Sequence, residues 1–428
     1  MKRVFSLTLA ALLLAGCATA PASGANETAS STATTETSVT VTPTADDTQP
    51  LRPLQLGDEK QYYMNEMVTG ELIRYWVADL TTHTTAIPCG VEGCTHDSES
   101  CPAVFRRGEC DRVFVLDDDT LVAFTNNQFP ETEDSQVILL DRNCQNRRVV
   151  ATVSQANFFS LGEDPSFSPY TDGQYLYCLG YTKDQNTLFR IDTASGTVTD
   201  LLGDAPARDL FLLGAVGGQF VFSQSDLTYP DSTVDPEAEA PAEPTGTDTH
   251  WLFDPHTGTW TEFRRYTSDD GSLHRMYCAI VDGQYYQVDR EAGSISVIDS
   301  QTGEATLLTD QYPTDQLQGS YLIQGIVEDW LIFYAPSPMV NLQTGEIREK
   351  PNLPDNYWNG SAHQPNICLN LGDTLLVDCR YEPYTRTVIG TGGTPYTVDA
   401  EHKYLGLISA EDFLNGVPNY TEVGEYVL

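Results

Sequence analysis

The chain of 428 residues carries 23 Lys and Arg against 61 Asp and Glu, which gives a formal net charge of −38. A surface this acidic repels phosphate backbones, so nucleic acid is not an expected partner. Hydrophobic residues make up 40% of the chain and charged residues 20%, a balance that provides a large core and excludes wholesale disorder.

Residues 1–16 have the pattern of a secretory signal. A basic start, Lys2-Arg3, precedes an apolar run over 4–15 that is too short to span a bilayer comfortably, and Leu14-Ala15-Gly16-Cys17 follows. This stretch resembles the lipobox of bacterial lipoproteins, whose alternative is a plain signal peptide with a chance cysteine. The resemblance implies cleavage before Cys17 and diacylation of its thiol. It predicts an extracytoplasmic protein of the bacterial cell envelope, held at the cell membrane by its lipid.

Residues 17–50 are expected to be the lipidated Cys17 and a disordered tether. Thr, Ala and Ser dominate residues 18–50, which contain no Lys, no Arg and no aromatic residue. Such a segment cannot bury enough apolar area to offset its chain entropy. The tether would hold the folded part, residues 51–428, clear of the membrane.

Four soft metal ligands, Cys89, Cys94, His96 and Cys101, fall within 13 residues in a predicted insertion at 89–110 between the first two blades of the fold. Three cysteines and a histidine are a zinc set, and four protein ligands leave no open position, so the zinc would be structural. The alternative is disulfide bonding, which is natural outside the cytoplasm. Disulfides cannot use every cysteine, because removing lipidated Cys17 from the ten leaves an odd number.

A short turn motif recurs along the folded part. Its form is Asp/Asn-x-x-Thr/Ser-Gly, in which the acid or amide caps a hairpin loop and the glycine takes a left-handed conformation. The clear copies are Asp192–Gly196, Asp254–Gly258, Asp299–Gly303 and Asn341–Gly345, weaker copies begin at Asp79 and Asp141, and a seventh is expected near Ser409. Successive copies from Asp79 to Asn341 start 42 to 62 residues apart. A four-stranded propeller blade takes about 40–50 residues, which equals the shortest spacings.

The sequence therefore predicts an all-β protein, a β-propeller of seven four-stranded blades over residues 51–428. Six or eight blades are alternatives, and a pair of β-sandwiches is the competing architecture, because any hairpin can use such turns. Between the turns, apolar and polar residues alternate as in strands, and only 409–414 has a helical pattern. The repeats resemble quinoprotein-like and WD-type propeller blades. The resemblance does not extend to a quinone site, since only Gly258 has a Trp close behind it and no two cysteines are adjacent.

An acidic loop, an aromatic stretch and three cysteines in strands also allow predictions. Residues 226–249 read as an acidic, Pro-rich mobile loop within one blade. Tyr357, Trp358 and His363 lie in a polar stretch that suits carbohydrate or peptide binding, with a packed loop as the alternative. Cysteines within strand-like runs, Cys178, Cys278 and Cys379, are expected to be small buried apolar residues.

No hydrolase, metalloprotease or phosphate-binding motif occurs in the chain. We therefore expect a binding or interaction module for a protein, peptide or glycan, with no cofactor beyond the structural zinc. The alternatives are a propeller enzyme acting on glycans or peptides at the central funnel, and a structural subunit of an envelope complex. The fold alone does not distinguish these roles.

Overall fold

The structure is a computed structural model that describes most of residues 50–427. The residues within that range that it does not describe are 69–71, 107–111, 126–133, 154–155, 159–167, 183–185, 204, 207–209, 230–243, 314–322, 334–337, 352, 354–356, 359–360, 363–364 and 390–393. Cys17 and the predicted tether up to residue 49 lie outside the described residues. Within the described part, no helix has the length and apolar character needed to cross a membrane.

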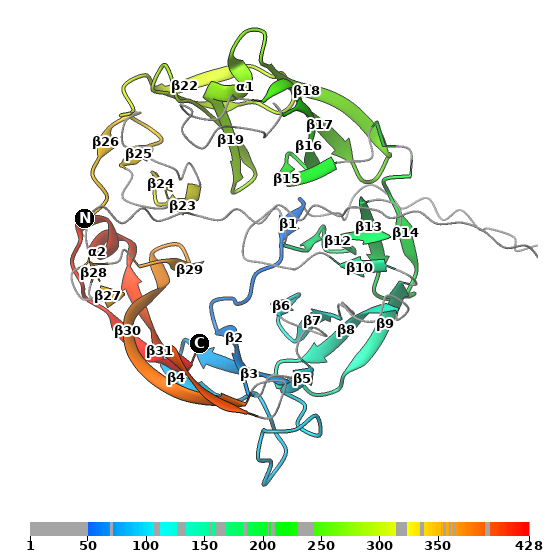
Figure 1. The fold of residues 1–428 in the computed structure, drawn as a ribbon, viewed down its shortest axis with the longest axis vertical. Coiled ribbons are helices and arrows are strands. Elements are labelled where there is room, and N and C mark those ends of the chain that lie inside the picture. Colours follow the sequence, from blue (N-terminus) through cyan, green and yellow to red (C-terminus); the bar gives the residue numbers. More distant parts are fainter. Residues whose placement is uncertain are drawn as a thin grey trace, which may run out of the picture. The chain divides into compact units, whose positions relative to one another are not determined.

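Seven antiparallel sheets follow one another along the chain (Figure 1). Blade 1 comprises β2 (Gln61–Met67), β3 (Leu72–Asp79), β4 (Thr84–Ala86) and β5 (Val104–Arg106). Blade 2 comprises β6 (Val113–Val115), β7 (Thr120–Phe124), β8 (Ser135–Asp141) and β9 (Arg148–Val153). Blade 3 comprises β10 (Ala156–Phe158), β11 (Tyr170–Thr171), β12 (Tyr175–Thr182), β13 (Asn186–Asp192) and β14 (Val198–Asp200), to which β1 (Arg52–Pro53) is added.

The remaining four blades are each built from four consecutive strands. Blade 4 comprises β15 (Leu210–Val216), β16 (Gln219–Thr228), β17 (Thr245–Asp254) and β18 (Thr259–Thr267), and blade 5 comprises β19 (Met276–Val281), β20 (Gln284–Asp289), β21 (Ser294–Ile298) and β22 (Ala305–Thr309). Blade 6 comprises β23 (Ile323–Val327), β24 (Trp330–Phe333), β25 (Met339–Asn341) and β26 (Ile347–Arg348), and blade 7 comprises β29 (Ile367–Asn370), β30 (Thr374–Ile389), β31 (Pro395–Ser409) and β32 (Thr421–Val427). The other elements are α1 (Ser272–Arg275), α2 (Ala410–Asn415) and the small hairpin β27 (Tyr357–Trp358) and β28 (Ser361–Ala362).

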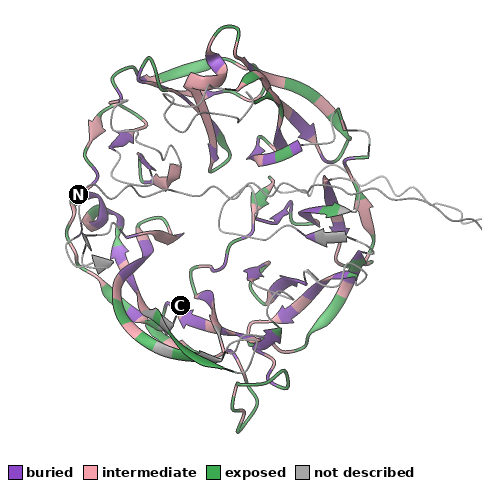
Figure 2. Ribbon diagram, viewed as in Figure 1, coloured by how far each residue is buried: buried purple, intermediate pink, exposed green. Residues whose placement is uncertain are grey.

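The predicted seven-bladed propeller is confirmed, and the alternative of two β-sandwiches is wrong. The innermost strands of successive blades contact one another, as β15 does β19, β19 does β23 and β23 does β29. The ring closes where β32 contacts β3 and β4 of blade 1, without exchange of a strand between the two blades. Exposed residues concentrate on the outer strands and in the loops, while the inner strands are buried or, as in β19 and β23, mostly half-buried (Figure 2).

In blades 2 to 6 the recurrent turn lies between the last two strands of the blade, whereas in blade 1 it lies between β3 and β4, before β5. In the copy at Asp299, Oδ1 accepts hydrogen bonds from the N–H groups of Gln301 (2.9 Å) and Thr302 (2.7 Å), and Gly303 has φ +71°. Blade 7 departs from the pattern, because helix α2 stands there with Ser409 as its N-cap. The helical prediction for 409–414 is thus confirmed.

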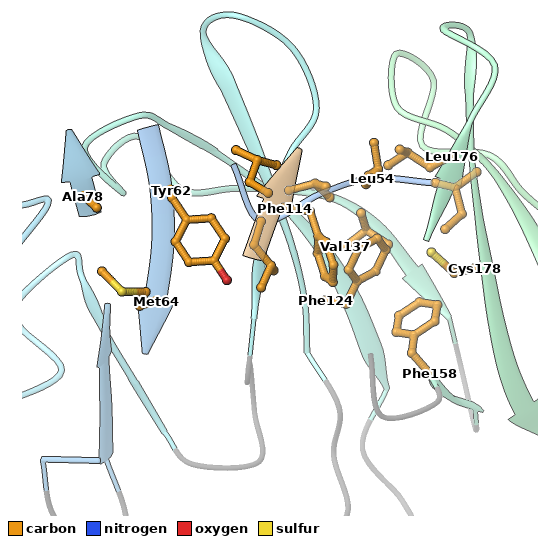
Figure 3. Packing of buried hydrophobic residues seen from close by; sticks show 14 of the residues in the cluster. Leu54, Tyr62, Met64, Ala78, Phe114, Phe124, Val137, Phe158, Leu176 and Cys178 are labelled. Carbon is orange, nitrogen blue, oxygen red and sulfur yellow. The ribbon is translucent and has the colours of Figure 1, made fainter. Parts of the chain in front are cut away.

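The core lies in the interfaces between neighbouring blades. One cluster joins blades 4 and 5, another joins blades 5 and 6, and a third joins blades 6 and 7. The largest cluster connects blades 7, 1, 2 and 3, and an edge-to-face series of phenylalanines, Phe114, Phe124, Phe158 and Phe189, crosses it with ring centroids 5.3–6.2 Å apart (Figure 3). Each blade is therefore stabilised mainly by its neighbours.

The described chain begins inside the ring. Leu54 is 1% exposed and packs into the largest cluster, its N–H donates to the Pro169 carbonyl at 2.7 Å, and the Val115 N–H donates to the Gln55 carbonyl at 2.9 Å. Residues 50–59 thus bridge blades 2 and 3 along the axis.

The expected acidic loop is shorter than residues 226–249. Strands β16 and β17 remain paired from Phe220 with Phe253 to Thr228 with Thr245, so both ends of the predicted loop belong to a long hairpin. Its central residues, 230–243, lie outside the described part. The alternating side chains of these arms supply the missed strand signal.

Candidate metal centre and central cavity

The Cys/His segment is an insertion within blade 1, which corrects the expected position between two blades. Strand β3 pairs with β4 through residues 77–79 and with β5 through residues 72–74, so β4 and β5 occupy one edge of the sheet in succession. Residues 87–103, here called the Cys/His loop, leave the sheet between these two short strands and project outward (Figure 1). A loop of this kind has little core of its own.

The four predicted ligands come together at the Cys/His loop. One ligand atom from each of Cys89, Cys94, His96 and Cys101 lies within 4.8 Å of the other three, and His96 Nδ1 is 3.3 Å from Cys101 Sγ. Tetrahedral zinc with bonds of about 2.3 Å to sulfur places its ligands about 3.8 Å apart, so small shifts suffice to close the site. This cluster could hold a metal such as zinc. The three thiols are free rather than joined in disulfides.

Local backbone geometry aims the ligands inward. His96 has φ +56° and Gly93 φ +73°, which turns the chain twice between Cys89 and Cys101. Arg74 of β3 holds the loop, since Nη1 donates to the His96 carbonyl at 3.3 Å while Nη2 pairs with Glu66 at 2.5 Å. The sheet beneath therefore positions the cluster.

The thiols differ in their surroundings. Cys101 is fully buried, and burial raises the pKa of its thiol to about 12, whereas hydrogen bonding from the His96 backbone lowers the pKa of the Cys94 thiol. A buried thiol of this kind ionises readily only beside a strong positive charge. A divalent metal supplies that charge.

A central cavity of about 1250 Å³ lies along the axis of the propeller. It is lined by residues 50–59 and by the innermost strands β6, β15, β19, β23 and β29, which surround the axis in Figure 1. The lining includes more acidic than basic side chains: Asp58, Glu59, Asp117, Asp118 and Asp282 against Arg52. The cavity wall is therefore negative.

One part of this acidic lining is held rigidly. Arg142 Nη2 pairs with Asp58 Oδ2 at 2.6 Å and donates to the Asp117 carbonyl at 2.7 Å. Burial alone would raise the pKa of Asp58, but hydrogen bonds from the Lys60 and Gln61 N–H groups, together with Arg142, lower it. Asp117 and Asp118 are exposed; Asp118 Oδ1 lies 3.6 Å from Lys60 Nζ, and Asp117 Oδ1 accepts a hydrogen bond from the Asp119 N–H at 3.0 Å, so each carboxylate keeps one oxygen for a ligand.

The predicted ligand-binding residues Tyr357, Trp358 and His363 are described only in part. Tyr357 and Trp358 form β27, which pairs with β28, and their side chains are not described. His363, like Cys17, lies outside the described residues.

The three cysteines predicted to be buried within strands differ in their burial. Cys178 and Cys379 are buried as expected, but Cys278 on β19 is half-buried and lines the cavity. Its Sγ lies 3.8 Å from both ring nitrogens of His250 on β17. No local pattern in the sequence signals this contact, because His250 follows the polar residues Thr247, Asp248 and Thr249 along β17.

The chain has similar solved structures but no match by sequence. No protein-family model matches the chain, and no curated protein matches it. The solved structures similar to it include TolB from Acinetobacter baumannii (10% identity, TM-score 0.34, covering 82% of this chain and 76% of that chain). Others are an oligogalacturonate lyase from Vibrio parahaemolyticus (12%, TM-score 0.42, 83% and 91%) and a puromycin hydrolase (9%, TM-score 0.42, 85% and 59%). Identities this low concern the fold alone and leave activity open.

Proposed function

We propose that this protein is a lipid-anchored, extracytoplasmic binding module whose central cavity takes a basic peptide segment. The observation that carries the proposal is the acidic cavity of about 1250 Å³ at the axis. Small-molecule pockets usually measure about 300–1,000 Å³, so this cavity suits a segment of several residues. Cys17 would carry the lipid and the tether would give the propeller reach.

The charge of the cavity selects among ligands. Carboxylates at Glu59, Asp117 and Asp118 act together with a formal net charge of −38, and a concave low-dielectric wall concentrates their field. Lys and Arg side chains of a peptide would meet this wall favourably, whereas an acidic peptide would be repelled. A neutral glycan would gain little from it.

Binding can be measured by fluorescence anisotropy of the full chain in detergent with labelled basic, acidic and neutral decapeptides. We expect the basic peptide to bind and the double variant Asp117→Asn/Asp118→Asn to weaken it about tenfold at low salt. The double variant Glu262→Gln/Glu304→Gln, which removes the same charge from exposed positions outside the cavity lining, is the control. Equal binding of all three peptides would contradict the proposal, and turnover of a peptide or oligosaccharide would favour the enzyme alternative.

The anchor is tested separately. Cys17→Ser should abolish labelling by a fatty-acid analogue and release the protein from the membrane fraction, because the acyl chains supply the membrane affinity. Unchanged membrane partitioning of this variant would contradict lipid anchoring. It would leave the binding proposal intact.

The Cys/His loop has a structural part in this proposal. Zinc held by Cys89, Cys94, His96 and Cys101 would fill its tetrahedron with protein ligands and pin a loop that the sheet alone does not order. The zinc would supply no open position for chemistry.

A further inference from the structure

Cys278 belongs to a polar cluster between blades 4 and 5 that the proposed peptide site does not use. We call Asp248, His250, Cys278 and Tyr285 the interior thiol cluster. His250 is 1% exposed, with Nε2 3.3 Å from Asp248 Oδ2 and Nδ1 2.7 Å from the Tyr285 hydroxyl. Of these four residues only Cys278, which is half-buried, lines the central cavity, whereas His250 is buried.

The hydrogen bonds of the cluster fix the protons of His250. Tyr266 donates its hydroxyl hydrogen to Gln287 Oε1 at 3.1 Å, so the 3.0 Å contact between the two tyrosine oxygens requires Tyr285 to donate to Tyr266. His250 Nδ1 must then donate to Tyr285, and Nε2 must donate to the Asp248 carboxylate. Both ring nitrogens carry hydrogen, so His250 is an imidazolium.

Further contacts hold that charge in place. Asp248 Oδ1 accepts hydrogen bonds from Ser223 Oγ (2.6 Å) and Ser225 Oγ (3.3 Å), which keep the carboxylate ionised. Burial alone would lower the pKa of His250, but Cys278 and Asp248 raise it to about 9. The titratable and charged groups that face the cluster are Asp248 and His250 on β17, Arg264 and Tyr266 on β18, Cys278 on β19 and Tyr285 on β20.

The sulfur of Cys278 lies against the imidazole ring of His250. Sγ of Cys278 is 3.8 Å from both Nδ1 and Nε2 of His250, so it faces the ring as a whole rather than one N–H group. A cysteine packed against a histidine is the arrangement found in activated thiols. Because Asp248 and Tyr285 occupy both ring nitrogens, His250 is not free to shuttle a proton to a leaving group.

We propose that Cys278 is a reactive thiol that forms mixed disulfides with low-molecular-weight disulfides entering the central cavity. The Cys278 thiolate attacks one sulfur of the small disulfide, a new S–S bond forms, and the old S–S bond breaks. The electron pair leaves on the second sulfur, which takes a proton from water. One thiol and one disulfide yield one mixed disulfide and one small thiol, and the exchange needs no proton shuttle.

The test uses the full chain and cystamine, a cationic disulfide that suits the negative cavity wall, with acid quenching, alkylation of the remaining thiols and peptide mass spectrometry. Cys368 is the internal reference, because it also lines the cavity and is also half-buried. We expect Cys278 to react about tenfold faster than Cys368 at pH 6, because its sulfur lies against the His250 ring.

Two histidine variants sharpen the test. His250→Gln should slow Cys278 about tenfold at pH 6 and leave Cys368 unchanged, and His256→Gln, in an exposed turn of blade 4, should change neither. If His250→Gln does not fold, the comparison of Cys278 with Cys368 in the unaltered chain decides alone. A Cys278 rate equal to that of Cys368 at pH 6 would overturn the proposal.

Discussion

The Cys/His loop and the interior thiol cluster both bring cysteine and histidine together, but they are assembled in opposite ways. The loop gathers its four ligands from 13 consecutive residues on the outer edge of one blade. The interior cluster joins β17 of blade 4 to β19 and β20 of blade 5, at the wall of the axial cavity. The difference is between a site encoded by local spacing and one created by packing.

The two sites also differ in what orders them. At the ends of the Cys/His loop, Cys101 is buried in the hydrophobic cluster of blades 1 and 2 and Cys89 packs against that cluster. Most of residues 90–100 are exposed, so a bound metal would stabilise this part of the loop. The interior thiol cluster is already ordered by the interface between blades 4 and 5, where its neighbours include Val221, Ile280 and Ile298. One site therefore depends on a ligand and the other on the fold.

The largest effect should follow from removing the buried imidazolium. His250→Gln leaves the half-buried Asp248 carboxylate without its charge partner, and we expect the free energy of unfolding to fall by about 1.5–3 kcal/mol at pH 6. Urea unfolding of the variant and the unaltered protein measures this difference. A loss below about 1 kcal/mol would mean that the cluster does not depend on its ion pair.

The same measurement at higher pH tests the charge itself. The pKa of folded His250, about 9, lies above the ordinary value of about 6.5, so the stability from its charge is fully present below pH 6.5. That stability is lost as the pH rises through 9. The difference between the variant and the unaltered protein should therefore shrink from pH 6 to pH 9.5, and a constant difference would contradict a charged His250.

A smaller difference in stability should distinguish two glycines of the repeated turn, one constrained by its own conformation alone and one also by a neighbouring blade. Gly303 and Gly345 have nearly equal φ angles, +71° and +70°, but an added Cβ at Gly345 would meet the Leu308 carbonyl of blade 5 at 2.1 Å, while one at Gly303 meets nothing within 4 Å. Gly303→Ala should cost about 1 kcal/mol from conformation alone, and Gly345→Ala about 2–3 kcal/mol. Equal losses in thermal unfolding would show that only the local turn matters.

Much of the fold could be predicted because its signals repeat. The Asp or Asn that caps each turn, and the left-handed glycine after it, are local requirements of one hairpin, and their spacing gave the seven blades. The Cys/His cluster could be predicted for the same reason. Its place within blade 1 could not, because β4 and β5 are only three residues long and share one edge of β3.

The rest of the site depends on which strands meet. Cys278 follows an apolar pattern along β19, and nothing near it in sequence shows that His250, 28 residues earlier, lies against its sulfur. Residues 50–59 were expected to begin the fold, but their course along the axis depends on bonds to Pro169 and Val115. Contacts between blades leave no repeating pattern in the sequence, so they could be identified only from the structure.

The most direct test of the contrast is the zinc content of the full chain, measured by elemental mass spectrometry after purification under reducing conditions without chelator. We predict about one zinc ion per chain, and less than about a tenth of a zinc ion per chain in His96→Ala. His83→Ala is the matched control, because His83 is exposed in the same blade and has the same φ of +56° as His96. Zinc below about a tenth in the unaltered chain, with a disulfide among Cys89, Cys94 and Cys101 in native cells, would contradict it.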